Sequence, residues 1–493
     1  MSPKKPLKPF YITTTLPYVN AEAHLGHALE FVRADAVART KHMLGHEVLF
    51  NTGTDEHGVK IYQKAQETGV PTQQFVDAYA EKFKSLHKLL GLKADAPGEG
   101  FYSHFIRTTD PHHVAAATEF WKICAANGYI YKKAYKGFYC VSDEAFVTEK
   151  DMVNGFCPNH PGVPLLEVEE ENYFFKFSAF SEKLAALYTE RADFVVPHSR
   201  FNEAKNLISQ GLEDFSISRI ASRMPWGIPV PGDEAHVMYV WFDALVDYIS
   251  TIGWPQDASS FEKWWTETGG VVQYCGKDNL QHQALRWQAM LMSVGLTPSL
   301  QIVVNGFVTG ESGVKMSKSL GNVVNPVDLV NEYGTDAVRY YVLRELSMFE
   351  DSPFSRDLFK AAYNTGLANG IGNLVSRVMR MATTNGVELA AGDAPAELDE
   401  KVAGHVEKYE HNKAMDEIWA TAGELDRFIQ EKEPFKLIKT DPARAKEDIA
   451  HLLAGLSWIA FNLRPFLPET AAKIQECLDT KTMPSAPLFL RKD

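Results

Sequence analysis

The feature that most constrains the fold is an alternation of strand and helix patterns that stops and later resumes. Residues 10–16 form a β-rich run that ends at Pro17, and apolar side chains then recur at helical spacing across 24–43. A second buried strand pattern, VLFNTG at 48–53, follows this helix. Alternation of this kind predicts a parallel sheet with crossover helices.

The alternation is interrupted at residues 128–216, where short aromatic strands flank an acidic link that contains proline. It resumes with VMYVWFDALVDYI, VVQYCGKD and QIVVNGF, and beyond about residue 355 only helical periodicities remain. We therefore expect an α/β domain split by an α+β insertion and followed by a helical bundle. The boundaries we assign are 1–127 and 217–325 for the halves of the α/β domain, 128–216 for the insertion, 326–365 for a linker region and 366–493 for the bundle.

Composition and charge narrow the class of protein. The 493 residues are 45% hydrophobic and 23% charged, as in ordinary globular proteins, and this length predicts about three domains. Because the formal net charge is −13, a nucleic-acid partner would have to meet local basic patches. Five cysteines are few and odd in number, which argues against a disulfide framework. No apolar run approaches the ~20 residues of a membrane span, so we expect a cytoplasmic protein without membrane contact.

The motif HLGH, His24 to His27, follows the first predicted strand at the start of a helix. A doubly wound fold places phosphate chemistry at this point, where helix amides face the ligand. Gly26 lets a ligand approach the backbone closely. The two imidazoles are about one helical turn apart, so they share a face and can both donate to phosphate oxygens. The alternative is a pair of ordinary helix histidines.

The motif KMSKS lies in the glycine-flanked stretch GVKMSKSLGN, residues 313–322. Flexible ammonium groups such as those of Lys315 and Lys318 are suited to neutralising charge on a triphosphate. The alternative is a solvated surface loop. Each motif is weak alone, whereas the two together, one in each half of a split α/β domain, favour a nucleotide site.

A third glycine-containing stretch, GLANGIG, includes Gly366, Gly370 and Gly372. It lies in a helical pattern and lacks the G-x-G-x-x-G spacing of a dinucleotide site. It therefore predicts close helix packing.

In this order, HLGH and KMSKS resemble the two ATP-binding motifs of the class I aminoacyl-tRNA synthetases. Over essentially its whole length the chain is similar to the methionyl-tRNA synthetase family. The matching stretches are TTLPYVNAEAHLGH (14–27), NTGTDEHG (51–58), EEENYFFKFS (169–178), ISR (217–219), YVWFDALVDYI (239–249), GKD (276–278), GVKMSKSLGNVVNP (313–326) and GNLVSR (372–377).

The resemblance implies a Rossmann-type parallel sheet, split by an α+β connective insertion and followed by an α-helical anticodon-binding bundle. It implies a ligase that activates L-methionine with ATP and Mg²⁺ to methionyl-adenylate and pyrophosphate, and then charges the 3′-terminal adenosine of tRNA(Met). It assigns catalysis to His24, His27, Lys315 and Lys318. It assigns ATP binding to the same residues and to Gly26, Gly276, Asp278 and Ser317.

The resemblance also implies a methionine pocket. Its positions are Leu16, Tyr18, Asp55, Trp241, Ala244, Tyr248, Gln283 and Trp287, with Asp55 meeting the substrate ammonium group and Arg219 contacting the adenylate. A polarizable thioether favours aromatic contacts, which fits this set. Without the resemblance, Trp241 and Tyr248 could equally be core aromatics. Relatives typically have phenylalanine and histidine where this chain has His282 and Gln283. Gln283 either hydrogen-bonds in place of that histidine or takes no part.

Three positions match the anticodon-reading residues of the family: Asn373 and Arg377, which share a helical face, and Phe435, where relatives have tryptophan. Base stacking on an aromatic ring is worth ~1–3 kcal/mol, and phenylalanine still offers a π face. The alternative is an amide and a cation on an ordinary helix surface. The chain ends without the appended domain through which some relatives dimerise, so we expect a monomer.

The insertion contains a degenerate zinc-knuckle-like hairpin. Relatives carry C-x-x-C and C-x-x-H here, and this chain has Cys140, Asp143, Cys157 and His160. Structural zinc sites favour thiolate and imidazole over carboxylate. Zinc binding and a metal-free hairpin both stay open, and we favour the metal-free hairpin.

Two other functions stay open. A non-catalytic tRNA-binding relative would keep the bundle but lose the catalytic motifs, all of which are present. A synthetase for another amino acid would keep the ATP motifs and change the pocket, and Gln283 is the one departure that leaves room for it.

Overall fold

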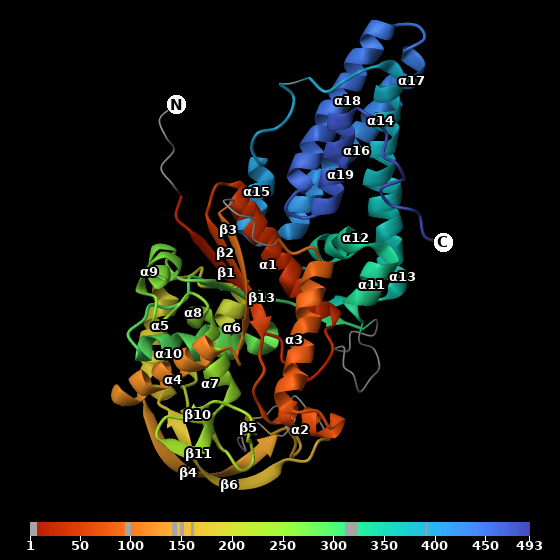
Figure 1. The fold of residues 1–493 in the computed structure, drawn as a ribbon. Coiled ribbons are helices and arrows are strands. Elements are labelled where there is room, and N and C mark those ends of the chain that lie inside the picture. Colours follow the sequence, from red (N-terminus) through yellow and green to blue (C-terminus); the bar gives the residue numbers. More distant parts are fainter. Residues whose placement is uncertain are drawn as a thin grey trace.

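In the computed structural model, the described residues are 7–93, 100–140, 145–147, 152–158, 162–310, 324–390 and 392–493. Figure 1 shows three parts along the long axis of the molecule: an antiparallel sheet at one end, a parallel sheet with helices in the middle, and a helical bundle at the other end. Among the helices of these residues, none is long and apolar enough to cross a membrane.

The central sheet has six parallel strands in the order β3-β2-β1-β12-β13-β7. The part β3-β2-β1-β12-β13 runs outward from β1 to both sides as in a Rossmann fold, and it confirms the predicted parallel sheet. The edge strand β7 departs from that order, because it precedes β12 in the chain but lies beside β13. The strands are β1 (Phe10–Thr13), β2 (Val48–Thr54), β3 (Phe101–Arg107), β7 (Val195–Val196), β12 (Val272–Gly276) and β13 (Gln301–Asn305). Every residue of β2 is buried, as expected for a strand covered on both faces.

Helices cover both faces of this sheet. One face packs on α1 and α3, which join an apolar core that continues into the bundle, and the other packs on α4 and α10. The helices of this part are α1 (Leu25–Met43), α2 (Val59–Thr68), α3 (Thr72–Leu89), α4 (Pro111–Ala126), α7 (Val240–Ala244), α8 (Asp247–Ser250), α9 (Ala258–Phe261), α10 (Trp287–Ser293), α11 (Pro326–Tyr333) and α12 (Thr335–Tyr340). Short 3₁₀ or π segments are η2 (Glu262–Glu267), η3 (Lys277–Asn279), η4 (His282–Arg286) and η6 (Tyr341–Glu345).

The insertion is built on an antiparallel sheet of order β5-β4-β6-β8. Its strands are β4 (Ile130–Cys140), β5 (Ala145–Val147), β6 (Leu166–Phe175) and β8 (Phe215–Ser216). Between β6 and β8 lie η1 (Phe177–Phe180), α5 (Ser181–Glu190) and α6 (His198–Ser209). The range 128–216 does not separate cleanly from the α/β domain, because β7 lies inside it and pairs with β13 of the parallel sheet. Two smaller sheets contain β9 (Ser218–Ile220), β10 (Pro229–Val230) and β11 (Asp233–Met238), and β14 (Val308–Thr309) with β15 (Ser352–Pro353).

The C-terminal part is helical, as its periodicities predict. It comprises α13 (Arg356–Ala362), η7 (Tyr363–Gly372), α14 (Asn373–Asn385), α15 (Glu400–Glu407), α16 (His411–Lys432), α17 (Pro434–Leu437), α18 (Pro442–Leu463) and α19 (Pro468–Thr480). The helix-packing prediction for GLANGIG is confirmed at Gly366, where an added Cβ would collide with the Tyr340 hydroxyl. The bundle meets the α/β domain through buried polar contacts, including a hydrogen bond of 2.7 Å from Nε of Arg339 in α12 to the backbone carbonyl of Phe466, between α18 and α19.

Candidate active site

A cavity of about 410 Å³ opens at the carboxyl ends of β1, β2 and β12. The strand order reverses between β1 and β12, and ligands bind at such a switch point in doubly wound sheets. The residues expected from the sequence that line this cavity are Leu16, Tyr18, His24, Gly26, His27, Asp55, Trp241, Ala244, Tyr248, Gly276, Asp278 and Gln283. The fold thus brings positions from both halves of the split domain to one cavity.

The HLGH motif forms the start of α1, with His24 as the N-cap residue. The rings of His24 and His27 stack with centroids 3.8 Å apart, so they share a face as their spacing predicts. The His27 ring also packs edge-on against Phe83 of α3. A Cβ on Gly26 would lie 3.0 Å from the His24 ring, so only glycine leaves this stack undisturbed. The result is a fixed pair of imidazoles at a helix N-terminus, which suits an anionic ligand.

The segment after β2 is held from two sides. Asp55 borders the cavity, and its backbone bridges Tyr18 in parallel fashion. His57 lies two residues on and its Nδ1 is 2.7 Å from a carboxylate oxygen of the buried Asp243. Burial opposes the charge of Asp243, but His57 and His113 outweigh it and lower the pKa of that carboxyl. This contact links the Asp55 segment to α7, the helix that carries Trp241.

Gln283 is part of the cavity wall and is buried. Its Nε2 donates to the Tyr248 hydroxyl at 2.6 Å, and its Oε1 accepts from Gln273 at 2.7 Å. The side chain of Gln273 in turn accepts a hydrogen bond from Ser299 at 2.5 Å. Of the two possibilities left by the sequence, the glutamine therefore hydrogen-bonds within the pocket.

His282 has a separate role, because its ring stacks on Trp241 with centroids 3.8 Å apart. Burial and the neighbouring charge of Arg286 lower the pKa of His282 well below its ordinary value, so the ring is neutral. The neutral, flat ring therefore packs on the Trp241 ring, while His282 itself does not line the cavity. Sequence reasoning noted His282 only as a departure, and no local pattern indicated the stack.

Glu30 and Asp247 are acidic residues of the cavity wall that sequence reasoning missed. The Glu30 carboxylate accepts a hydrogen bond of 2.6 Å from the Thr15 backbone N–H. Burial raises the pKa of Glu30 to about 8, and the charge of Asp278 adds to this. Burial also raises the pKa of Asp247 well above its ordinary value. Glu30 could have been found from its helical spacing, since it lies three residues after His27.

Two expected residues lie behind the cavity rather than on it, within the described part of the chain. Trp287 is fully buried and packs its ring against Tyr248 at a centroid distance of 5.9 Å. Arg219 lies 4.1 Å over the ring of Tyr239, near the start of α7. Trp287 thus supports the cavity residue Tyr248 from outside, whereas the contact of Arg219 is with Tyr239, which does not itself line the cavity.

Several expected residues lie outside the described residues. These are Lys315, Ser317 and Lys318 of the KMSKS motif, and Asp143 and His160 of the hairpin. The hairpin thiols of Cys140 and Cys157 are buried in one small cluster with Val147. Within the described residues, which include only two of the four hairpin positions, there is no group of three or more metal-ligating side chains.

The expected anticodon-reading residues lie on the bundle. Asn373 begins α14 and is exposed, and Arg377 one turn later pairs with Asp426 of α16 at 2.7 Å. Phe435 lies in α17, at the end of the bundle far from the sheet, and is 46% exposed (Figure 1). Burial raises the pKa of Asp426, and the positive charge of Arg377 offsets part of this rise.

Comparisons with known proteins agree on one family. Residues 10–164 and 162–379 match the family described as tRNA synthetases class I (M), and residues 388–487 match the anticodon binding domain of methionyl tRNA ligase. The chain is 39% identical over 490 residues to the methionine–tRNA ligase of Clostridium perfringens, covering 96% of this chain and 74% of the relative. It is 38% identical to that of Mesorhizobium japonicum, covering 95% and 91%.

Solved structures give the same result. The Mycobacterium tuberculosis methionyl-tRNA synthetase in complex with methionyl-adenylate superposes with a TM-score of 0.86 at 35% identity, covering 95% of this chain and 94% of that one. The apo form of that enzyme gives a TM-score of 0.81 at 31% identity over 99% of both chains. The chain therefore belongs to the class I methionyl-tRNA synthetase family.

Proposed function

We propose that this protein is a methionine–tRNA ligase that forms methionyl-adenylate from L-methionine and ATP and then charges tRNA(Met). The single observation that supports this most is the cavity at the strand-order reversal, lined both by the stacked His24 and His27 and by Asp55, Trp241 and Tyr248. A nucleotide site and an aromatic amino-acid site would then share one cavity, as adenylate formation requires. Family membership supports the same reaction.

In the activation step, the methionine carboxylate attacks the α-phosphorus of ATP in line. A C(O)O–P bond forms while the bond to the β-phosphate oxygen breaks, and pyrophosphate leaves. His24 and His27 would donate hydrogen bonds to phosphate oxygens, and Lys315 and Lys318 would neutralise the leaving pyrophosphate. Mg²⁺ enters with ATP as part of the substrate complex. The protein acts by positioning and charge neutralisation, with no covalent enzyme intermediate.

The methionine site would have a polar part for the ammonium group and an aromatic part for the thioether. Asp55 would accept the substrate ammonium group. Trp241 and Tyr248 would surround the thioether, since a polarizable sulfur favours aromatic contacts. Gly276 and Asp278, at the end of β12, would hold the adenosine. These assignments agree with the position of each residue on the cavity wall.

The bundle would read the CAU anticodon. Asn373 and Arg377 would supply hydrogen bonds, and the exposed ring of Phe435 would stack on a base. We assign 326–365 to the acceptor-stem contact and the link between the two sites.

We further propose a cytoplasmic monomer whose hairpin packs without structural zinc. All five cysteines are buried and reduced, as is usual in a reducing compartment.

The large apolar side chains that are exposed within the described residues lie on separate elements, which argues against an extensive dimer interface. The carboxylate of Asp143 stands where structural zinc favours a thiolate. Light scattering and metal analysis of the purified protein test these points.

Amino-acid-dependent exchange between ATP and pyrophosphate, measured across all twenty amino acids, tests the proposed reaction. We expect exchange with methionine alone, collapsing in Lys318→Ala and unchanged in the surface control Lys122→Ala. Exchange with another amino acid would mean a different pocket specificity. If the folded protein shows no exchange with any amino acid, it is a tRNA-binding relative without activity.

A further inference from the structure

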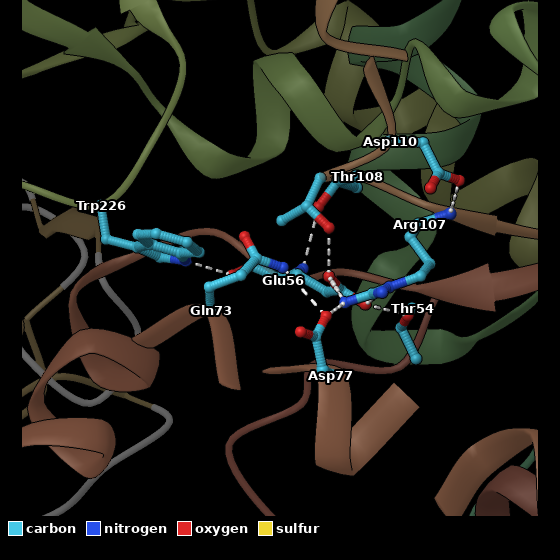
Figure 2. A network of polar contacts seen from close by, with 9 residues as sticks. Thr54, Glu56, Gln73, Asp77, Arg107, Thr108, Asp110 and Trp226 are labelled. Carbon is cyan, nitrogen blue, oxygen red and sulfur yellow. Dashed lines mark hydrogen bonds and ion pairs between the residues drawn. The ribbon is translucent and has the colours of Figure 1, made fainter. Parts of the chain in front are cut away.

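The residue next to Asp55 is a buried carboxylate whose hydrogen bonds are complete. Glu56 has no exposed surface, and its two oxygens accept from three side chains (Figure 2). Oε1 accepts from the Thr54 hydroxyl at 2.6 Å and from Nε of Arg107 at 2.7 Å. Oε2 accepts from Nη2 of Arg107 at 2.8 Å and from the Thr109 hydroxyl at 2.5 Å. A buried charge persists when it is paired and hydrogen-bonded in this way.

The backbone of Glu56 is held as firmly as its side chain. Its N–H donates to the Thr108 hydroxyl at 2.9 Å, and its carbonyl accepts from the indole N–H of Trp226 at 2.6 Å (Figure 2). Trp226 lies in the segment between β9 and β10, far along the sequence. Both ends of this residue are therefore fixed by parts of the chain outside β2.

The direction of Asp55 depends on this arrangement. Successive side chains of an extended segment point to opposite sides. The Asp55 side chain borders the cavity, whereas the Glu56 side chain points away from it toward Arg107. The next side chain, that of His57, contacts Asp243 instead of Arg107. A rotation that released Glu56 would also turn Asp55 away from the position in which it faces the cavity.

Arg107 joins this segment to a second part of the site. Its fork of two parallel hydrogen bonds holds Glu56, and the same Nη2 contacts Asp77 of α3 at 2.6 Å. Helix α3 also carries Phe83, whose ring packs on His27. Burial opposes the charge of Arg107, but Glu56 and Asp77 outweigh it and raise the pKa of the guanidinium. One cation thus connects the Asp55 segment to the helix behind the HLGH motif.

We propose that Arg107 is a positioning residue for methionine binding: through its bidentate contact with Glu56 it fixes the direction of Asp55, and so it sets the affinity for the substrate ammonium group. This inference rests on the proposed function. Arg107 itself lies outside the set of cavity-lining residues, so it acts through Glu56 and touches no substrate.

The test separates methionine binding from ATP binding in the pyrophosphate exchange reaction. For Arg107→Ala we expect the KM for methionine to rise at least about tenfold, because small displacements of a binding group cost ~10²-fold in unfavourable cases. The KM for ATP and kcat should stay within about twofold. Arg107→Lys keeps the charge but not the fork, and its KM for methionine should fall between those of wild type and Arg107→Ala.

Arg344→Ala is the matched control. Arg344 is also a partly buried arginine, 23% exposed against 19% for Arg107, and it also contacts two carboxylates, those of Glu345 and Asp416. It lies in η6 and does not line the cavity within the described residues. We expect its exchange parameters to match those of wild type even where its melting temperature falls as far as that of Arg107→Ala.

Asp77→Asn keeps the test decisive if Arg107→Ala does not fold, because Asp77 is half exposed and its replacement leaves the buried pair intact. We expect a rise of about three- to fivefold in the KM for methionine alone, which a partly exposed ion pair can contribute. The inference is wrong, and Arg107 is merely structural, if an Arg107 or Asp77 variant changes the KM for methionine, the KM for ATP and kcat together. The same conclusion follows if the rise in the KM for methionine only tracks the loss of melting temperature across the variants. An absence of methionine exchange in the wild-type protein would instead contradict the proposed function.

Discussion

The cavity at the edge of the parallel sheet and the surface of the helical bundle hold their candidate binding residues in different ways. In the cavity, Gln283 and the Asp55 segment are fixed by buried hydrogen bonds that extend two or three residues behind them. On the bundle, Phe435 is 46% exposed and Arg377 has one partly exposed ion pair with Asp426.

The difference follows from the ligands. A small amino acid offers few atoms, so its binding residues must be ordered in advance, since each side chain immobilised on binding costs about 0.5–1.5 kcal/mol. An RNA loop offers bases and phosphates over a large area, and single-stranded bases are recognised by stacking on exposed rings. We therefore expect substitutions in the cavity to have sharp effects on one substrate, and substitutions on the bundle to affect only the tRNA-dependent step.

The largest effect is expected for Asp55→Ala. Loss of the carboxylate leaves the substrate ammonium without its partner in a partly buried site, which costs about 3–5 kcal/mol or ~10²–10⁴-fold. The KM for methionine should rise by this factor in the exchange reaction while the KM for ATP is unchanged. The exposed control Asp357→Ala should behave as wild type. A Asp55→Ala enzyme with normal methionine affinity would mean that the ammonium binds elsewhere.

Phe435→Ala tests the bundle. Removing the ring loses base stacking worth ~1–3 kcal/mol, so kcat/KM for tRNA should fall about 5- to 150-fold in the charging reaction. Pyrophosphate exchange needs no tRNA and should be unaffected. Leu490→Ala, which removes another exposed apolar side chain, is the control. A loss of exchange in Phe435→Ala would remove the distinction between the two regions.

Gln283→Ala tests how much the buried hydrogen bonds contribute to the cavity. The change leaves the Gln273 amide without its acceptor and the Tyr248 hydroxyl without its donor, at a cost of about 1–3 kcal/mol. The KM for methionine should rise about 5- to 150-fold. Gln283→His restores a donor toward Tyr248 and should recover most of the affinity. If both variants bind methionine as tightly as wild type, the buried hydrogen bonds of Gln283 do not contribute to methionine affinity.

Glu30→Gln tests how a buried carboxyl group of the cavity wall makes the stability of the protein depend on pH. The pKa of Glu30 is raised to about 8 by burial, so its ionisation disfavours the folded state. Its contribution to stability is complete below its ordinary pKa near 4.5 and is lost as the pH rises toward 8. Each pH unit in this window costs wild type up to about 1.4 kcal/mol through this group, and glutamine removes the cost. Melting curves should show the variant gaining stability over wild type as the pH rises from 5 to about 8; a constant difference would contradict this.

The smallest effect is expected for Asp426→Ala. Partly exposed ion pairs contribute about 0–1 kcal/mol, so the melting temperature should change by no more than about 3 °C. Arg377 loses a competing carboxylate, and the KM for tRNA should fall slightly, by no more than about fivefold. Charging at varied tRNA concentration measures this. A large loss of charging would mean that Asp426 orders Arg377 in advance, as the cavity residues are ordered.

The sequence by itself determined much of the fold and several candidate site residues. The strand-helix alternation predicted the parallel sheet, and HLGH was correctly expected at the start of α1 with both rings on one face. Helix packing at Gly366 was predicted too. These features are local: they depend on periodic burial and on side chains within about one helical turn, which a sequence displays directly.

The tertiary structure alone decided which distant groups meet. Nothing in the order of residues indicated that β7 joins the parallel sheet, that His282 stacks on Trp241, or that Arg107 holds Glu56. Such pairs are separated by tens of residues, and their contact depends on strand order and on the path of each crossover. Neighbouring residues such as Asp55 and Glu56 look alike in sequence, but the extended backbone turns one toward the cavity and the other toward Arg107, so the fold gives the two carboxylates different roles.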